Sequence, residues 1–142
     1  MNSVSTSRSN YFAVKDRKAF DKEIASLPLD LAIVENEDGS GRVALLVEDE
    51  GGSFYYWDTD ERDDPAIDPE EDEQHWVGDV IRKHLAPGET CVLMTVSAEG
   101  LRSMRGYACA FQDAGSILQV SLFDILDMAE KKFGKRPNPP EL

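Results

Sequence analysis

Apolar and polar positions alternate over several short stretches of the chain, and apolar positions recur at helical spacing in three others. The strand-like stretches are residues 10–15, 29–35, 42–48, 53–57, 90–97, 104–111 and 116–120. The helical stretches are residues 17–27, 73–85 and 122–133. The resulting order, β-α-β-β-β-α-β-β-β-α, predicts an α+β fold with a mostly antiparallel sheet and about three helices packed on it.

Capping residues support two of the three predicted helices. Asp16 stands where an N-cap is expected, and Pro28 ends the first helix because proline cannot continue it. Ser121 and Asp124 have the spacing of a capping box at the start of the third helix, and Gly134 is a typical C-terminal signal. These residues predict where both helices begin and end.

Two strands carry unusual side chains. Residues 90–97 form a nearly continuous apolar run, which predicts a strand near the middle of the sheet that is covered on both faces. In the aromatic strand, alternation places Phe54 and Tyr56 on one face and Tyr55 and Trp57 on the other. We expect one pair to fill the core, which leaves the other pair either covered by helices or available as an interface anchor.

The length of 142 residues fits a single domain, 1–142, large enough to bury a hydrophobic core. Three parts of this domain carry few apolar residues. We expect a loose polar N-terminus at residues 1–9, an exposed acidic loop at 58–72 and a loose Pro-rich tail at 135–142. The first ten residues lack an apolar targeting segment, so the expected location is the cytoplasm.

The negative charge of the chain is concentrated in one stretch. The net charge is −13, and residues 35–73 contain sixteen acids and two bases, whereas the rest contains twelve acids and thirteen bases. This balance disfavours direct nucleic-acid binding, which requires a basic footprint. The charged stretch is either a solvated loop that maintains solubility or a surface that meets a basic partner.

A calcium site is suggested by the start of the acidic loop but not by the remainder. Asp58 and Asp60 match the first positions of an EF-hand loop. The pattern then fails, because Asp63 replaces the required glycine and Pro69 replaces the final glutamate. We therefore expect no dedicated metal site.

Catalytic and zinc-binding patterns are also missing from the sequence. His75 and His84 lack the spacing of a zinc helix, and Cys91 and Cys109 lie in apolar strand-like runs, where a thiol is usually inert. The chain contains no G-x-S-x-G elbow and no phosphate-binding glycine loop. These observations predict a protein that is not an enzyme and uses no cofactor.

Two segments, residues 7–16 (SRSNYFAVKD) and 87–102 (PGETCVLMTVSAEGLR), resemble small acidic orphan proteins encoded on bacterial plasmids, phages and integrated elements. The resemblance implies a mobile-element accessory gene, a context in which anti-restriction and anti-CRISPR inhibitors are common. It carries over no functional residue.

The leading hypothesis is a non-enzymatic inhibitor or adaptor whose acidic surface occupies the nucleic-acid-binding cleft of a basic protein, since carboxylates can replace phosphates as partners of Lys and Arg. The candidate partner-binding residues are Trp57, Asp58, Asp60, Glu61, Asp63, Asp64, Glu70, Glu71 and Asp72. An immunity or antitoxin-like protein that caps a basic toxin shares these electrostatics. A small metal-dependent enzyme and a domain whose acidity serves only solubility are the remaining alternatives.

Overall fold

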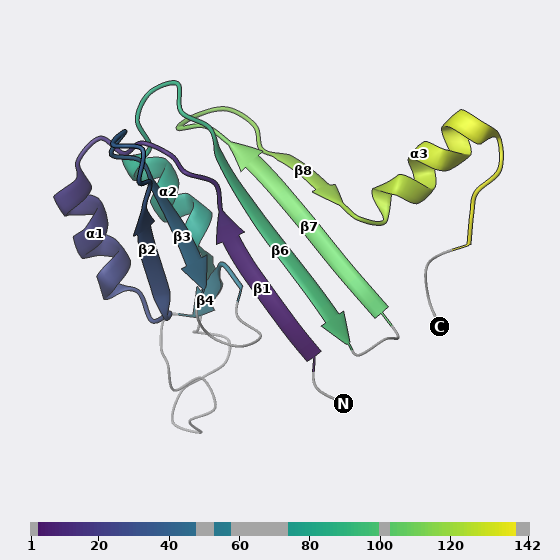
Figure 1. Ribbon diagram of the computed structural model, residues 1–142, viewed down its shortest axis with the longest axis horizontal. Coiled ribbons are helices and arrows are strands. Elements are labelled where there is room, and N and C mark those ends of the chain that lie inside the picture. Colours follow the sequence, from purple (N-terminus) through teal and green to yellow (C-terminus); the bar gives the residue numbers. More distant parts are fainter. Residues whose placement is uncertain (1–2, 48–52, 58–73, 100–102, 139–142) are drawn as a thin grey trace.

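The structure is a computed structural model that describes residues 3–47, 53–57, 74–99 and 103–138. Its strands and helices follow the order β1(Ser3–Ser9), α1(Arg17–Ser26), β2(Leu31–Glu35), β3(Val43–Val47), β4(Tyr55–Trp57), β5(Gln74–Trp76), α2(Val77–His84), β6(Cys91–Glu99), β7(Ser103–Phe111), β8(Leu118–Ser121) and α3(Asp124–Phe133). Six strands form one antiparallel sheet in the order β2-β3-β1-β6-β7-β8, and β4 pairs with β5 in a separate ribbon (Figure 1). The predicted α+β class and element order are confirmed, with β5 as an additional short strand.

The expectation of a loose N-terminus at residues 1–9 is wrong for residues 3–9, and residues 1 and 2 lie outside the described residues. Ser3–Ser9 form β1, which lies inside the sheet and pairs with β6 over seven positions. The predicted first strand at residues 10–15 is reduced to two isolated bridges, at Phe12 and Val14. The first strand therefore lies about seven residues closer to the N-terminus than the hydrophobic pattern indicates.

Hydrogen bonds explain how such a polar segment forms an interior strand. The side chains of Ser7 and Ser9 point into the covered side of the sheet and are almost fully buried. The Ser7 and Thr95 hydroxyls are 2.8 Å apart, and Ser9 Oγ accepts a 2.8 Å hydrogen bond from the Leu45 backbone N–H. Buried polar groups are tolerated when they are paired in this way.

The first helix and the following hairpin agree with the prediction. The Asp16 carboxylate accepts hydrogen bonds from the backbone N–H groups of Lys18 and Ala19, so it caps α1 as expected. Strands β2 and β3 pair antiparallel from Leu31↔Val47 to Glu35↔Val43.

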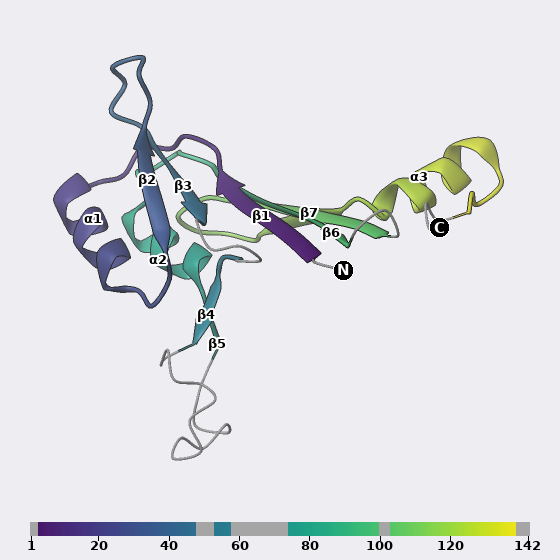
Figure 2. The same ribbon diagram turned by 60° about the horizontal axis from the view of Figure 1, so that its bottom comes forward.

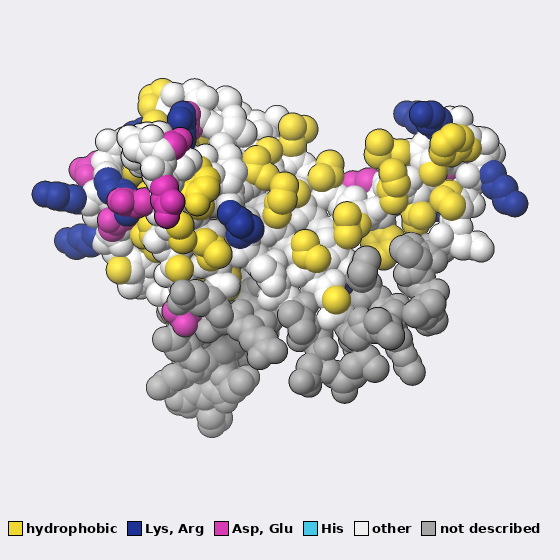
Figure 3. Space-filling view, viewed as in Figure 1, with side chains coloured by type: hydrophobic (Ala, Val, Ile, Leu, Met, Phe, Trp, Pro, Cys, Tyr) yellow, Lys and Arg dark blue, Asp and Glu magenta, His cyan; other side chains and the backbone are white. Residues whose placement is uncertain are grey.

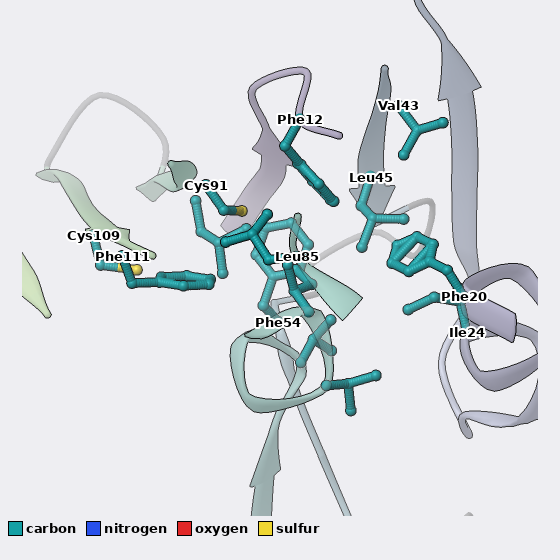
Figure 4. Packing of buried hydrophobic residues seen from close by; sticks show 14 of the residues in the cluster. Phe12, Phe20, Ile24, Val43, Leu45, Phe54, Leu85, Cys91, Cys109 and Phe111 are labelled. Atoms are coloured by element: carbon teal, nitrogen blue, oxygen red, sulfur yellow. The ribbon is translucent and has the colours of Figure 1, made fainter. Parts of the chain in front are cut away.

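The hydrophobic core lies between helices α1 and α2 and one face of the sheet (Figure 4). Phe12, Phe20, Leu45 and Leu85 have no exposed surface. The rings of Phe12 and Phe20 meet edge to face with centroids 5.9 Å apart. Cys91 and Cys109 are buried free thiols, in agreement with their apolar surroundings in the sequence.

Strand β6 lies in the middle of the sheet as predicted, but the expectation that both its faces are covered is wrong. Cys91, Leu93 and Thr95 are buried, whereas Met94 and Val96 expose 52% and 56% of their surface. The nearly continuous apolar run therefore reflects a second face of β6 that is apolar and exposed in the described chain, not one buried under helices.

The boundaries of the last two helices differ in accuracy. The second helix begins at Val77, not at residue 73, because Gln74–Trp76 pair with β4 as strand β5. The third helix, α3, ends as predicted at Gly134, whose φ of 81° is in the left-handed region that glycine favours. Residues 135–138 follow it without regular structure and are exposed.

The elements are distributed unevenly over the sheet. Helices α1 and α2 lie at the end formed by β2 and β3, whereas α3 extends beyond the edge at β8 (Figures 1 and 2). The β4–β5 ribbon projects away from the sheet on the side of α2 (Figure 2).

Candidate functional site

An open pocket of about 370 Å³ lies where the β4–β5 ribbon meets strands β7 and β8. Its lining residues are Tyr55, Trp76, Tyr107, Ala108, Cys109, Gln119, Val120, Ser121 and Asp124. Three aromatic rings and one carboxylate stand out in this set, and no Lys, Arg or His of the described residues lines the pocket. We call it the aromatic pocket.

The core holds the Trp76 wall of the aromatic pocket in place. The Trp76 ring packs edge to face on the buried Phe111, with centroids 5.2 Å apart. It also lies over Gly78, where an added Cβ would come within 2.4 Å of the indole. On the Phe111 ring lies the Arg82 guanidinium, which donates hydrogen bonds to the backbone carbonyls of Gln112 and Gly115. Packing on both sides therefore fixes the position of the indole.

Two tyrosines present more accessible rings. Tyr55 lies beside Trp76 in the ribbon and is 39% exposed, and Tyr107 on β7 is 44% exposed. Partial burial raises the pKa of the Tyr55 phenol, with a smaller contribution from the nearby Tyr107. The phenol therefore stays neutral at physiological pH, able to donate or accept a hydrogen bond.

Asp124 supplies the negative charge of the aromatic pocket. The Ser121 backbone N–H donates a 2.7 Å hydrogen bond to Asp124 Oδ2. This bond holds the carboxylate at the point where β8 turns into α3. The predicted capping box is nevertheless wrong, because α3 begins at Asp124 with Phe123 as its N-cap, and no side chain caps it. Aromatic faces and a carboxylate both attract cations, so the pocket favours a positively charged group.

The buried thiols are poorly suited to nucleophilic chemistry. Burial raises the pKa of Cys109, which lines the aromatic pocket, and raises that of Cys91 further. A thiol in this state is a weak nucleophile. His84 lies elsewhere, with Nε2 2.7 Å from the Glu23 carboxylate. Among the described residues, the aromatic pocket therefore has no activated thiol.

The structure places only one of the nine sequence-predicted partner-binding residues. Trp57 ends β4, opposite Gln74 at the start of β5, and its side chain lies outside the described residues. The other eight, Asp58, Asp60, Glu61, Asp63, Asp64, Glu70, Glu71 and Asp72, also lie outside them. The residues that flank segment 58–73, which has ten acids and one base, are Trp57 and Gln74, and the ribbon pairs these two residues.

The aromatic alternation is confirmed in part. Phe54 is buried, and Tyr56 packs partly against the core and stacks on His75 with centroids 5.2 Å apart. Tyr55 faces the aromatic pocket as the alternative pair suggested. Sequence reasoning missed Trp76 and Tyr107, because neither has a signal that separates a pocket wall from a core residue.

The described residues contain no group of three or more His, Cys, Asp or Glu side chains positioned to hold a metal ion. The EF-hand-like start at Asp58 lies outside them. No helix among these residues has the length and apolar character needed to cross a membrane.

Comparison with protein-family models, curated proteins and solved structures gives no match to the chain.

Proposed function

We propose that the protein is a non-enzymatic binding module that recognises a basic protein partner and acts on it as an inhibitor or adaptor. The observation that carries the proposal is the aromatic pocket itself: three aromatic rings and the Asp124 carboxylate, with no basic residue in the lining. Such a site suits a Lys or Arg side chain, because a cation over an aromatic face and beside a carboxylate is attracted by both.

The acidic segment 58–73 supplies attraction over a longer range. In the sequence it lies between Trp57 and Gln74 of the β4–β5 ribbon, and the ribbon residues Tyr55 and Trp76 line the aromatic pocket. A cationic surface drawn to the acidic segment is therefore brought close to the pocket. Electrostatic attraction of this kind speeds association and weakens as salt is added.

A protein that binds nucleic acid is the class of partner that this combination fits best. Its binding cleft presents Lys and Arg side chains to phosphates, and carboxylates offer the same anionic oxygens. Among the described residues, Arg17, Arg42, Lys83 and Arg136 are held in ion pairs with acids of the same chain. These pairs reduce the free positive charge that would oppose such a partner.

Binding of an oligoarginine peptide tests the proposal in its simplest form. The expected result is saturable binding, followed by Trp fluorescence, that weakens steeply with salt. Replacing Tyr107 with Leu should reduce affinity about tenfold, since loss of an aromatic anchor typically costs 1–2 kcal/mol or more. The matched control is Tyr11→Leu, a half-buried tyrosine outside the aromatic pocket, which should bind as the wild type does.

Charge in the acidic segment is tested separately. The Asp60/Asp63/Asp64→Asn variant should bind more weakly and show a shallower salt dependence. A control with the same charge change, Asp21/Asp30/Asp113→Asn, alters acids outside the segment and should show a smaller loss. If the two triple variants lose the same affinity for oligoarginine, net charge alone explains the loss. If Tyr107→Leu binds as the wild type does, the aromatic pocket has no part in binding.

A further inference from the structure

The exposed apolar side chains of the protein are gathered in one region. Eleven large hydrophobic residues are exposed in the described chain, and nine of them lie on β6–β8, on α3 or between β8 and α3. These nine are Met94, Val96, Tyr107, Leu118, Val120, Leu122, Ile125, Met128 and Phe133. Tyr107 pairs with the buried Thr95 and lies on the opposite face of the sheet, in the aromatic pocket, so eight of the nine belong to this region. Figure 3 shows hydrophobic side chains over these strands and along the helix. Monomeric proteins rarely leave an apolar area of this kind uncovered.

The sheet contributes a shallow groove to this region. Pairing places Met94 beside Ala108 and Ala108 beside Val120, so the three side chains form one row across β6, β7 and β8. Small residues along β7 lower its surface between the larger side chains of its neighbours. The groove has a volume of about 220 Å³ and an almost entirely apolar lining. We call this surface the open face.

Helix α3 contributes an amphipathic stripe with few partners in its own chain. The apolar side chains of α3 at helical spacing are Ile125, Leu126, Met128, Ala129 and Phe133, and only Leu126 among them is buried. A helix of ten residues is marginally stable in water without packing. The stripe therefore lacks the contacts that normally hold such a helix.

The start of α3 is fixed so that the helix leaves its own sheet. The Leu122 backbone N–H donates a 2.8 Å hydrogen bond to the Gly106 carbonyl, and the Leu122 side chain lies over Gly106, where an added Cβ would approach it to 2.8 Å. From this point α3 extends beyond the edge of the sheet in both ribbon views (Figures 1 and 2). The stripe and the open face of one chain are thus held apart.

A second copy of the chain supplies what each surface lacks. Each chain has both surfaces of a helix-on-sheet contact, the stripe and the open face. When a two-fold axis relates two copies, the stripe of each copy can pack on the open face of the other. Charge does not oppose this contact, because residues outside 35–73 carry twelve acids and thirteen bases. The ribbon that leads to the acidic segment projects away from α3 (Figure 2).

We propose that the protein forms a symmetric homodimer in which the apolar stripe of α3 from each copy packs on the open face of the other. The open face then becomes an interior layer, and α3 gains the packing that a short helix requires. The proposal does not depend on the binding of a basic partner.

The mass of the protein in solution tests this dimer. Light scattering at tens of micromolar should give twice the 15.8 kDa chain mass. Met128→Glu, in the stripe, should give the monomer mass. Lys131→Gln is the matched control, because it changes the charge of the same helix by the same amount at an exposed position outside the stripe, and it should remain dimeric. A monomeric wild type, or a Met128→Glu variant that remains dimeric, would overturn the proposal.

Mixing two variants tests the reciprocal arrangement. Met94→Glu, on the open face, should also be monomeric alone, and Val120→Glu on β8 replaces it if Met94→Glu does not fold. In a mixture with Met128→Glu, one of the two helix–sheet contacts is unaltered in each mixed dimer, so partial dimerisation should return. No recovery would contradict the reciprocal contact. Met128→Glu should still bind oligoarginine, which keeps this test separate from that of the proposed function.

Discussion

At one end of the sheet Phe12, Phe20 and Leu45 have no exposed surface, whereas at the other end Leu118 and Phe133 are each 74% exposed. The first end, formed by β2 and β3, is covered by α1 and α2 and resembles the interior of any small domain. The second end, formed by β6–β8 and α3, has most of the exposed large hydrophobic side chains of the described residues. Apolar residues in a sequence therefore predict that a surface is buried, but they do not show whether the same chain or another molecule buries it.

The strongest contrast should be seen in truncations of Phe to Ala at the two ends. Phe20→Ala removes a fully buried ring packed against Phe12 and should lower the free energy of unfolding by about 3–5 kcal/mol. Phe133→Ala should change it by less than about 0.5 kcal/mol, as expected for an exposed site. Both are measured by urea unfolding in the Met128→Glu background, which removes any self-association. Similar losses in the two variants would contradict the difference between the ends.

Two glycines under bulky side chains refine the contrast. Gly78→Ala places a methyl group against the Trp76 indole, which Phe111 prevents from moving, and should cost about 1–3 kcal/mol as overpacking does. Gly106→Ala meets the Leu122 side chain, which has open space beside it, and should cost less. Unfolding curves give both values. A red shift of Trp emission should accompany Gly78→Ala only.

Polar burial within β1 gives a further test. Ser9→Ala leaves the buried Leu45 N–H without its side-chain acceptor and should cost about 1–2 kcal/mol. Thr6→Ala, on the exposed side of the same strand, should stay within about 0.5 kcal/mol. If the two substitutions cost the same, the serine hydroxyls do not explain why this polar segment forms a strand.

The smallest expected effect concerns pH. Hydrogen bonds from Lys83, and then His84, lower the pKa of Glu23 below its usual 4.5. The stability that this carboxylate contributes is therefore present above about pH 4.5 and is lost as the pH falls through its lower pKa in the folded state. Glu23→Gln should lower the free energy of unfolding by about 0.5–1 kcal/mol at pH 7. It should have no effect at a pH below the pKa that Glu23 has in the folded state. Urea unfolding at several pH values measures both. A difference that persists in acid would assign the effect to packing.

Prediction from sequence worked where one local signal decides the structure. Asp16 and Pro28 mark α1, and Gly134 marks the end of α3, because caps and breakers act through the backbone of their own segment. It failed at Ser3–Ser9, where the acceptors and donors that stabilise a polar strand lie more than thirty residues away on β3 and β6. Long-range hydrogen bonds leave no periodic pattern in the chain.

The candidate site could be predicted from the sequence only in part, for a related reason. The charge of residues 58–73 and the aromatic strand before them are visible in the sequence. The contributions of Tyr107 and Asp124 to the aromatic pocket come from β7 and the start of α3, and only the fold brings them to Tyr55. Likewise, the apolar run of β6 predicts a central strand, but it cannot show whether a helix of the same chain or a different chain covers that strand.

A nuclear magnetic resonance titration with oligoarginine shows whether the aromatic pocket receives a cationic group. Our prediction is that the largest shifts fall on the side chains of Tyr55, Trp76 and Tyr107, and that they are lost in Tyr107→Leu and retained in Tyr11→Leu. Shifts confined to residues remote from the pocket, or unchanged by Tyr107→Leu, would contradict it.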